Sequence, residues 1–152
     1  MTALTADAKL YEVGVPANHE KLSFPVGASQ TLYGNSIAVT DTNGRLINPS
    51  APTSGKCWGL VDRGIVSSST ACSVSMDVNQ GIYAVPYCST DGFAQSDVGA
   101  KAYVWDNITV TKTAGSLITA GTVVAVSGIG QGVGLPAGYV AVAFGLVGSG
   151  AI

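Results

Sequence analysis

Charged side chains are scarce in this sequence. Only 11% of its 152 residues are Asp, Glu, Lys or Arg, whereas about 25% is usual for a soluble domain. The formal net charge is -2, and the seven lysines and arginines are scattered along the chain. Sequence-independent binding of nucleic acid requires clustered cations that displace counterions from phosphate. We therefore expect no nucleic-acid partner.

Histidine is almost absent, and the cysteines are not closely spaced. His19 is the only histidine, and Cys57, Cys72 and Cys88 form no Cys-x-x-Cys pair. A zinc site usually needs such close ligand pairs, and the scattered aspartates do not form a calcium loop. A nucleophile needs a base within hydrogen-bond reach, and His19 lies in an irregular segment. We expect no metal, no cofactor and no enzymatic activity. The thiols are predicted to be buried and free, or to form one disulfide with a spare thiol.

Long apolar runs are also missing. A membrane-spanning helix needs about 20 unbroken apolar residues, and glycines, Gln131 and Pro136 interrupt the uncharged stretch from Thr113 to Ile152. No membrane role is expected. Residues Met1–Thr5 do not show the basic region and apolar run of a secretory signal, so synthesis in the cytoplasm is expected. The glycines from Gly128 to Gly138 precede another strand pattern, which favours a turn over a phosphate-binding loop.

Strand patterns dominate what remains. Between Cys72 and Asn79, Cys72, Val74, Met76 and Val78 alternate with polar residues, the period of two that is typical of a half-buried strand. Asp41-Thr42-Asn43-Gly44 separates two apolar runs, and Asn-Gly supplies the positive φ angles of a tight hairpin turn. Further strands are predicted at Ile37–Thr40, Arg45–Ile47, Cys57–Val66, Gly81–Pro86, Ala100–Trp105, Ile108–Thr111, Thr122–Ser127 and Tyr139–Val147.

These patterns predict an all-β fold in a single domain, a β-barrel or β-sandwich (jelly-roll or β-tulip-like) with an extended N-terminal arm. The arm covers residues 1–30 and the β-rich domain residues 31–152. The arm contains both glutamates and the histidine. Leu10, Tyr11, Val13 and Val15 indicate a short strand in it, which Pro16 ends. We expect the arm to pack on its own barrel or on a neighbouring molecule.

The order of strands and glycines is the most informative feature of the sequence. It runs through Cys57–Val61, Ser73–Val78, Gly81–Val85, Asp97–Trp105, Ile108–Val110 and Tyr139–Ala143. This order resembles that of the capsid decoration (cement) proteins of tailed bacteriophages, over roughly half to two-thirds of the chain. The long loop at Gly128–Gly138 and the two tryptophans depart from the family pattern.

The resemblance implies a structural, non-enzymatic virion protein that stabilises the capsid. Such proteins are made in the host cytoplasm and bind the outside of a mature head, where they clamp neighbouring major capsid subunits. Their partners would be the major capsid protein and the protein itself, as a homotrimer or homodimer. The arm would face the capsid through Leu10, Tyr11, Val13, Leu22 and Phe24. Gly130 and Gly132 of the glycine loop would contact a neighbour.

An alternative function follows from the aromatic residues. Trp58, Tyr103 and Trp105 could stack on sugar rings if they were exposed as a row. Aromatic residues at strand spacing more often belong to a core or a subunit interface. The alternative is therefore a carbohydrate-binding β-module on a phage or cell surface.

Overall fold

A computed structural model describes residues 3–8, 12–14, 21–126 and 135–144 of the chain, and their regular structure is β apart from one short 3-10 turn, η1, at Gln95–Asp97. The strands are β1 (Glu12–Gly14), β2 (Lys21–Pro25), β3 (Thr31–Leu32), β4 (Ile37–Thr40), β5 (Leu46–Ile47), β6 (Lys56–Val61), β7 (Ile65–Val66), β8 (Ser75–Asn79), β9 (Gly81–Pro86), β10 (Lys101–Val104), β11 (Val110–Thr111), β12 (Thr119–Val126) and β13 (Tyr139–Phe144). The predicted all-β fold is confirmed.

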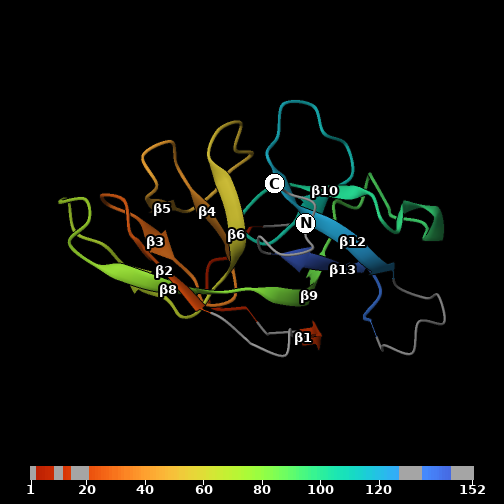
Figure 1. Cartoon of the computed structure of the whole chain (residues 1–152), viewed down its shortest axis with the longest axis horizontal. Coiled ribbons are helices and arrows are strands. Elements are labelled where there is room, and N and C mark those ends of the chain that lie inside the picture. Colours follow the sequence, from red (N-terminus) through yellow and green to blue (C-terminus); the bar gives the residue numbers. More distant parts are fainter. Residues whose placement is uncertain (1–2, 9–11, 15–20, 127–134, 145–152) are drawn as a thin grey trace.

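The strands form two main sheets that lie side by side along the long axis (Figure 1). A five-stranded sheet has the order β2-β8-β6-β4-β5, and a six-stranded sheet has the order β1-β9-β13-β12-β10-β11. All neighbouring strands in both sheets are antiparallel. The short strands β3 and β7 form a separate pair.

Each sheet curls, and a parallel bridge joins two of its strands that are not neighbours; in the five-stranded sheet these are the two end strands. Val26, directly after β2, pairs with Leu46 of β5, and the N–H of Gly27 donates to the Leu46 carbonyl at 2.9 Å. In the other sheet Tyr87, directly after β9, pairs with Val110 of β11. Closure of the five-stranded sheet in this way reduces the unpaired edges that would otherwise attract other strands, whereas β1 remains the outermost strand of the six-stranded sheet.

Two hydrophobic clusters fill the molecule, and β4 and β6 contribute to both. Ile37 and Val39 of β4 belong to a large cluster with the six-stranded sheet. Ala38, between them, belongs to a smaller cluster that the five-stranded sheet encloses. Because successive side chains of a strand point to opposite faces, β4 is buried on both sides. All four of its residues are buried, which explains its uninterrupted apolar run.

The smaller cluster also explains the alternation seen in β8. Met76 and Val78 are buried, while Ser75 and Asp77 between them are exposed. The strand begins later than the pattern suggests, since Cys72 is exposed and adopts φ 63°. Its N–H donates to the Val26 carbonyl at 3.0 Å. The predicted strand at Cys72 is therefore a turn.

The predicted hairpin is confirmed, whereas the strand expected at Cys57–Val66 is divided in two. Gly44 adopts φ 76° in the turn between β4 and β5. Residues Asp62–Gly64 separate β6 from β7, which belongs to a different sheet. Gly59 does not break β6; it lies within the strand at φ 148°. A Cβ atom there would lie 2.2 Å from the Asn79 carbonyl oxygen, so only glycine fits this crossing with β8.

We predict that Gly121→Ala destabilises the protein by about 1–3 kcal/mol, the usual cost of overpacking a filled core. Gly121 is buried in β12, and an added Cβ would lie 2.2 Å from the Ala143 carbonyl oxygen of β13. The backbone of β13 cannot move away from this atom without breaking the pairing of β12 with β13. Gly92→Ala is the matched control, because its nearest atom would be 3.7 Å away. Equal chemical-denaturation midpoints for both variants would contradict this account.

Candidate interaction surface

The N-terminal segment Ala3–Ala8 crosses the body with a bend at Thr5 and Ala6 and is held by polar groups. Asn107 binds the main chain of Leu4 twice: its Oδ1 accepts from the Leu4 N–H at 2.8 Å, and its Nδ2 donates to the Leu4 carbonyl at 3.3 Å. Ala8 is held in the same way, since its N–H donates to the Gly34 carbonyl at 2.9 Å and its carbonyl accepts from Asn35 Nδ2 at 2.8 Å.

The carboxylate of Asp7 is the one side chain of this segment that the body binds specifically. Its Oδ1 accepts from the Gly34 N–H at 2.7 Å. An added Cβ at Gly34 would lie 3.0 Å from the Asp7 Cγ, and one at Gly64 would lie 3.0 Å from its Oδ1. The two glycines therefore leave room for the carboxylate. Sequence reasoning missed these residues, because no periodicity marks them and Asn107 follows an aspartate as in an ordinary turn.

The next parts of the N-terminal region are strands of the body itself. β1 pairs with β9 as the outermost strand of the six-stranded sheet, and β2 pairs along its whole length with β8. The arm predicted for residues 1–30 thus contacts both sheets of its own molecule. Of the predicted contact residues, Val13 lies in β1, Leu22 and Phe24 lie in β2, and Leu10, Tyr11, Gly130 and Gly132 lie outside the described residues.

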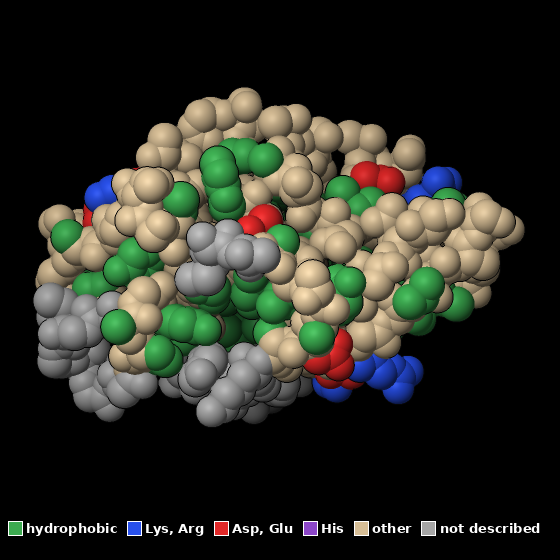
Figure 2. Space-filling view, turned by 180° about the vertical axis from the view of Figure 1, so that it is seen from behind, with side chains coloured by type: hydrophobic (Ala, Val, Ile, Leu, Met, Phe, Trp, Pro, Cys, Tyr) green, Lys and Arg blue, Asp and Glu red, His purple; other side chains and the backbone are tan. Residues whose placement is uncertain are grey.

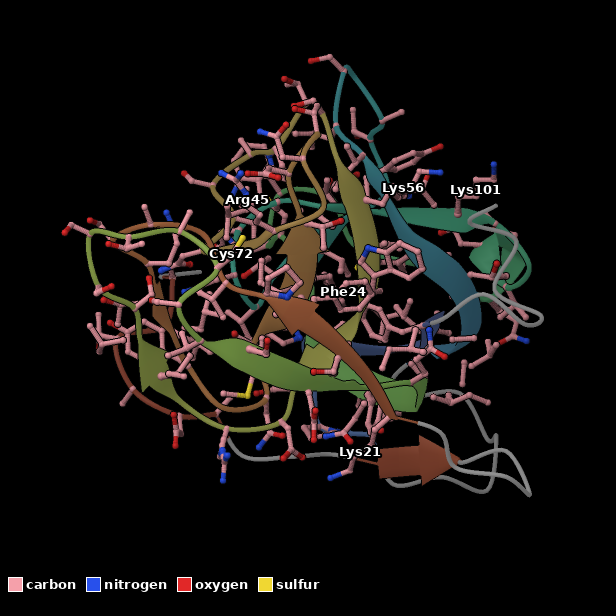
Figure 3. The ribbon with its side chains drawn as sticks, turned by 60° about the vertical axis from the view of Figure 1, so that its left-hand side comes forward. Lys21, Phe24, Arg45, Lys56, Cys72 and Lys101 are labelled. Atoms are coloured by element: carbon pink, nitrogen blue, oxygen red, sulfur yellow. The ribbon has the colours of Figure 1, made fainter. Side chains whose placement is uncertain are left out.

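Phe24 points from β2 toward the body (Figure 3). Its ring packs on that of Trp58, with centroids 5.0 Å apart, and both rings pack against the smaller cluster. The Trp58 Nε1 donates to Thr40 Oγ1 at 2.8 Å. Leu22 is half-buried in the same strand. Contact of Leu22 and Phe24 with a capsid stays a prediction, and any such contact would use only the part of each side chain that remains exposed.

A small polar network fixes the start of β2 to the sheet. Asp62 Oδ1 accepts from Asn79 Nδ2 at 2.9 Å and from Lys21 Nζ at 3.1 Å. The hydrogen bond from Asn79, then that from Lys21, lowers the pKa of Asp62 below its usual value, and the positive charges of Lys21 and Arg63 act in the same direction. The network joins residues from β2, β8 and the end of β6.

Asp91 has a similar role in the loop after β9. Its Oδ2 accepts from the Thr111 hydroxyl, from the Lys112 N–H at 3.1 Å and from the Thr113 N–H at 3.0 Å. Partial burial raises the pKa of Asp91, but these hydrogen bonds outweigh it and lower the pKa overall. The carboxylate thereby holds the loop on the residues around β11.

Exposed apolar side chains are few in the described part of the chain. The large ones are Val66 in β7, Trp105 after β10 and Val98 after the 3-10 turn, with exposed fractions of 72%, 44% and 39%. Figure 2 shows hydrophobic side chains gathered over the half formed by the six-stranded sheet, with charged groups small in number and set apart. Lys21, Arg45, Lys56 and Lys101 lie at separate places (Figure 3).

The three cysteines are free thiols, in agreement with the first of the two predictions. Their predicted burial is wrong for Cys72, which is exposed. Cys57 packs against the large cluster. Burial raises the pKa of its thiol to about 12, although hydrogen bonds with the backbone of Gly59 and Trp58 act in the opposite direction. At neutral pH this thiol is uncharged and therefore a poor nucleophile.

Among the residues that the structure describes, no group of three or more His, Cys, Asp or Glu side chains could hold a metal ion. Within the same ranges, no helix has the length and apolar character needed to cross a membrane. No protein-family model, curated protein or solved structure matches the chain.

We predict that the hydrogen bonds of Asp91 stabilise the fold at neutral pH and are lost in acid. Because the pKa is lowered on folding, the stabilisation is fully present above the unfolded value of about 4 and disappears as the pH falls through the folded value. Asp91→Asn should unfold about 1 kcal/mol more easily at pH 7, a figure reduced for partial solvent exposure. Near pH 2 the variant and the wild type should have similar stability.

Denaturant titrations between pH 2 and pH 7 would measure this difference. The control is Asp77→Asn, which alters an exposed carboxylate on β8 and should change stability little at either pH. A deficit for Asp91→Asn that is independent of pH would show that the carboxylate charge is not the cause.

Proposed function

We propose that the protein is a structural virion subunit that binds the outside of a mature phage head and clamps neighbouring major capsid subunits. The observation that carries this proposal is the course of the N-terminal region. The strands β1 and β2 and the segment of residues 3–8, which bends at Thr5 and Ala6, make main-chain hydrogen bonds at three separate places on the body. A chain that binds through its main chain can add to other strands in the same way.

The body has the stiffness that a clamp needs. The five-stranded sheet is joined end to end by a bridge, a second bridge joins β9 to β11 in the six-stranded sheet, and the strands β4 and β6 are packed from both sides. A close-packed interior deforms little under load. A load applied at one end of such a body would reach the other end with little loss through bending.

The surface composition also fits repeated symmetric contacts. Charged residues amount to 11% of the chain, and none occurs after Lys112. Interface cores are depleted in charged residues, and many weak contacts on a lattice add up through avidity. The resemblance in strand order indicates the major capsid protein and further copies of this chain, as a homotrimer or homodimer, as partners. The proposed location is the exterior of the capsid.

We predict saturable co-sedimentation of the purified protein with undecorated, expanded phage heads. Unexpanded heads are the control, because the subunit positions that a clamp bridges differ between the two lattices. A fixed number of bound copies per lattice site would reveal which symmetry axis is occupied. Equal binding to both kinds of head, or none to heads of the matching phage, would contradict the proposal.

The second candidate is a carbohydrate-binding module, and the exposure of Trp105 is the observation in its favour. Trp58 fits this function less well, since its ring packs on Phe24 and its Nε1 is already hydrogen-bonded. Tyr103 is half-buried in β10.

If the protein binds glycans through Trp105, saturating glycan should quench the tryptophan fluorescence of the wild type. Trp105→Phe should remove the quenching, because Trp58 would remain shielded. Trp58→Phe is the matched variant and should retain it. Absence of any change in fluorescence across a glycan array would exclude this mode of binding.

A further inference from the structure

The residues that hold the segment Ala3–Ala8 form a binding site for a short peptide segment, which we call the peptide clamp. It consists of Gly34, Asn35, Gly64 and Asn107. Leu4 and Ala8 are each bound through both their N–H and their carbonyl groups. Recognition at these two positions concerns the main chain and does not depend on the side chain. Asp7 adds the one specific element, a carboxylate accepted by the Gly34 N–H.

The polar side chain of the peptide clamp needs hydrogen-bond partners. Asn107 is only 2% exposed, and both polar atoms of its side-chain amide bind Leu4. A buried polar group that loses its hydrogen-bond partners destabilises the structure. Departure of the segment would therefore leave Asn107 unsatisfied unless another chain or water replaced it.

The segment itself has little to hold it in place. Ala3, Thr5, Ala6 and Asp7 are exposed, and Leu4 and Ala8 are only partly buried. Segments with few buried apolar contacts open at low free energy. The strand that follows, β1, has three residues and is the outermost strand on β9. Residues 3–8 and β1 are thus held by fewer buried contacts than the core strands and can leave the body more easily than those strands.

We propose that the peptide clamp accepts residues 3–8 of a second copy of this chain. Every hydrogen bond of the clamp would be the same between copies as within one, so exchange changes neither the donors nor the acceptors. This is the condition under which swapping of an element gives a dimer at low cost.

The inference that exchange takes place on a capsid rests on the proposed function, because a capsid lattice holds copies of the protein at high effective concentration. The contact does not rest on it and can be tested in solution. On a capsid, reciprocal exchange would link neighbouring copies, because each exchanged segment remains covalently joined to its own body. Each copy would then be retained by its neighbours as well as by the capsid.

Two variants with one introduced cysteine each test the exchange in the full-length chain, with Cys72→Ser and Cys88→Ser to remove two native thiols, so that Cys57, which packs against the large cluster, is the only native thiol left. One copy carries Asp7→Cys and the other Gly34→Cys, with different affinity tags. The Gly34 Cβ position lies 3.0 Å from the Asp7 Cγ, close to the distance of about 3 Å between a Cβ and the opposite sulfur in a disulfide. Between these two copies the bond forms above the level of random collision only if the segment is exchanged.

The expected result is a disulfide-linked heterodimer after mild oxidation of the concentrated mixture. Its yield should exceed by on the order of tenfold that of a control in which Thr42→Cys, in the exposed β4–β5 turn, replaces Gly34→Cys. The double variant Asp7→Cys, Gly34→Cys in one chain should close the same bond and confirms that the pair is correctly placed. If the double variant closes the bond but the mixture yields no more heterodimer than the control, exchange does not occur.

Failure of the double variant to form any bond, within or between chains, would contradict the clamp geometry and overturn the proposal as well. Co-sedimentation with heads separates this inference from the proposed function. Heterodimer formation without head binding would support the exchange and contradict the proposed capsid function. Head binding without heterodimer formation would support the capsid function and contradict the exchange.

Discussion

The fold depends on the burial of both faces of β4 and β6. In a sheet with one solvated face, a slip of one residue exchanges the apolar and polar sides. Here a slip of β4 would place Ala38 among the side chains that surround Ile37 and Val39, and would put larger side chains into the smaller cluster. Both packings would fail together. The register of these strands is thereby fixed from two sides, and the close crossing at Gly59 fixes the position of β8 on β6.

The few charged and amide side chains of this protein are used mainly to fasten its irregular parts. Asp62 ties β2 to the sheet, Asp91 ties a loop to β11, and Asn107 ties the N-terminal segment to the body. Hydrogen bonds to a charged acceptor are stronger than neutral ones, so one carboxylate can hold several backbone donors. A chain with so little charge keeps its loops in place in this way and still leaves most of its surface neutral.

Local signals in the sequence predicted the local structure well. The Asn-Gly turn, the alternation of Met76 and Val78, and the strand at Gly81–Pro86 are all present. What escaped prediction depends on residues far apart in the chain. The division of Cys57–Val66 follows from the assignment of β6 and β7 to different sheets, and the bridge of Val26 to Leu46 joins strands that share no sequence pattern. The peptide clamp joins Leu4 to Asn107, and neither residue carries a signal of its own.

The two proposals share a physical basis in the way the N-terminal region is bound. Side-chain packing of Phe24 commits β2 to its own sheet, whereas the main-chain hydrogen bonds of residues 3–8 can be made to any chain that presents matching groups. Each bond contributes only about 1 kcal/mol once the competition with water is counted. Alone, the six residues of Ala3–Ala8 would hold weakly; held beside identical clamps at high local concentration, they would remain bound because release from one is followed by capture at the next. A weak, sequence-tolerant segment on a stiff body is therefore better suited to joining repeated subunits than a tight one, which would stay closed on its own molecule.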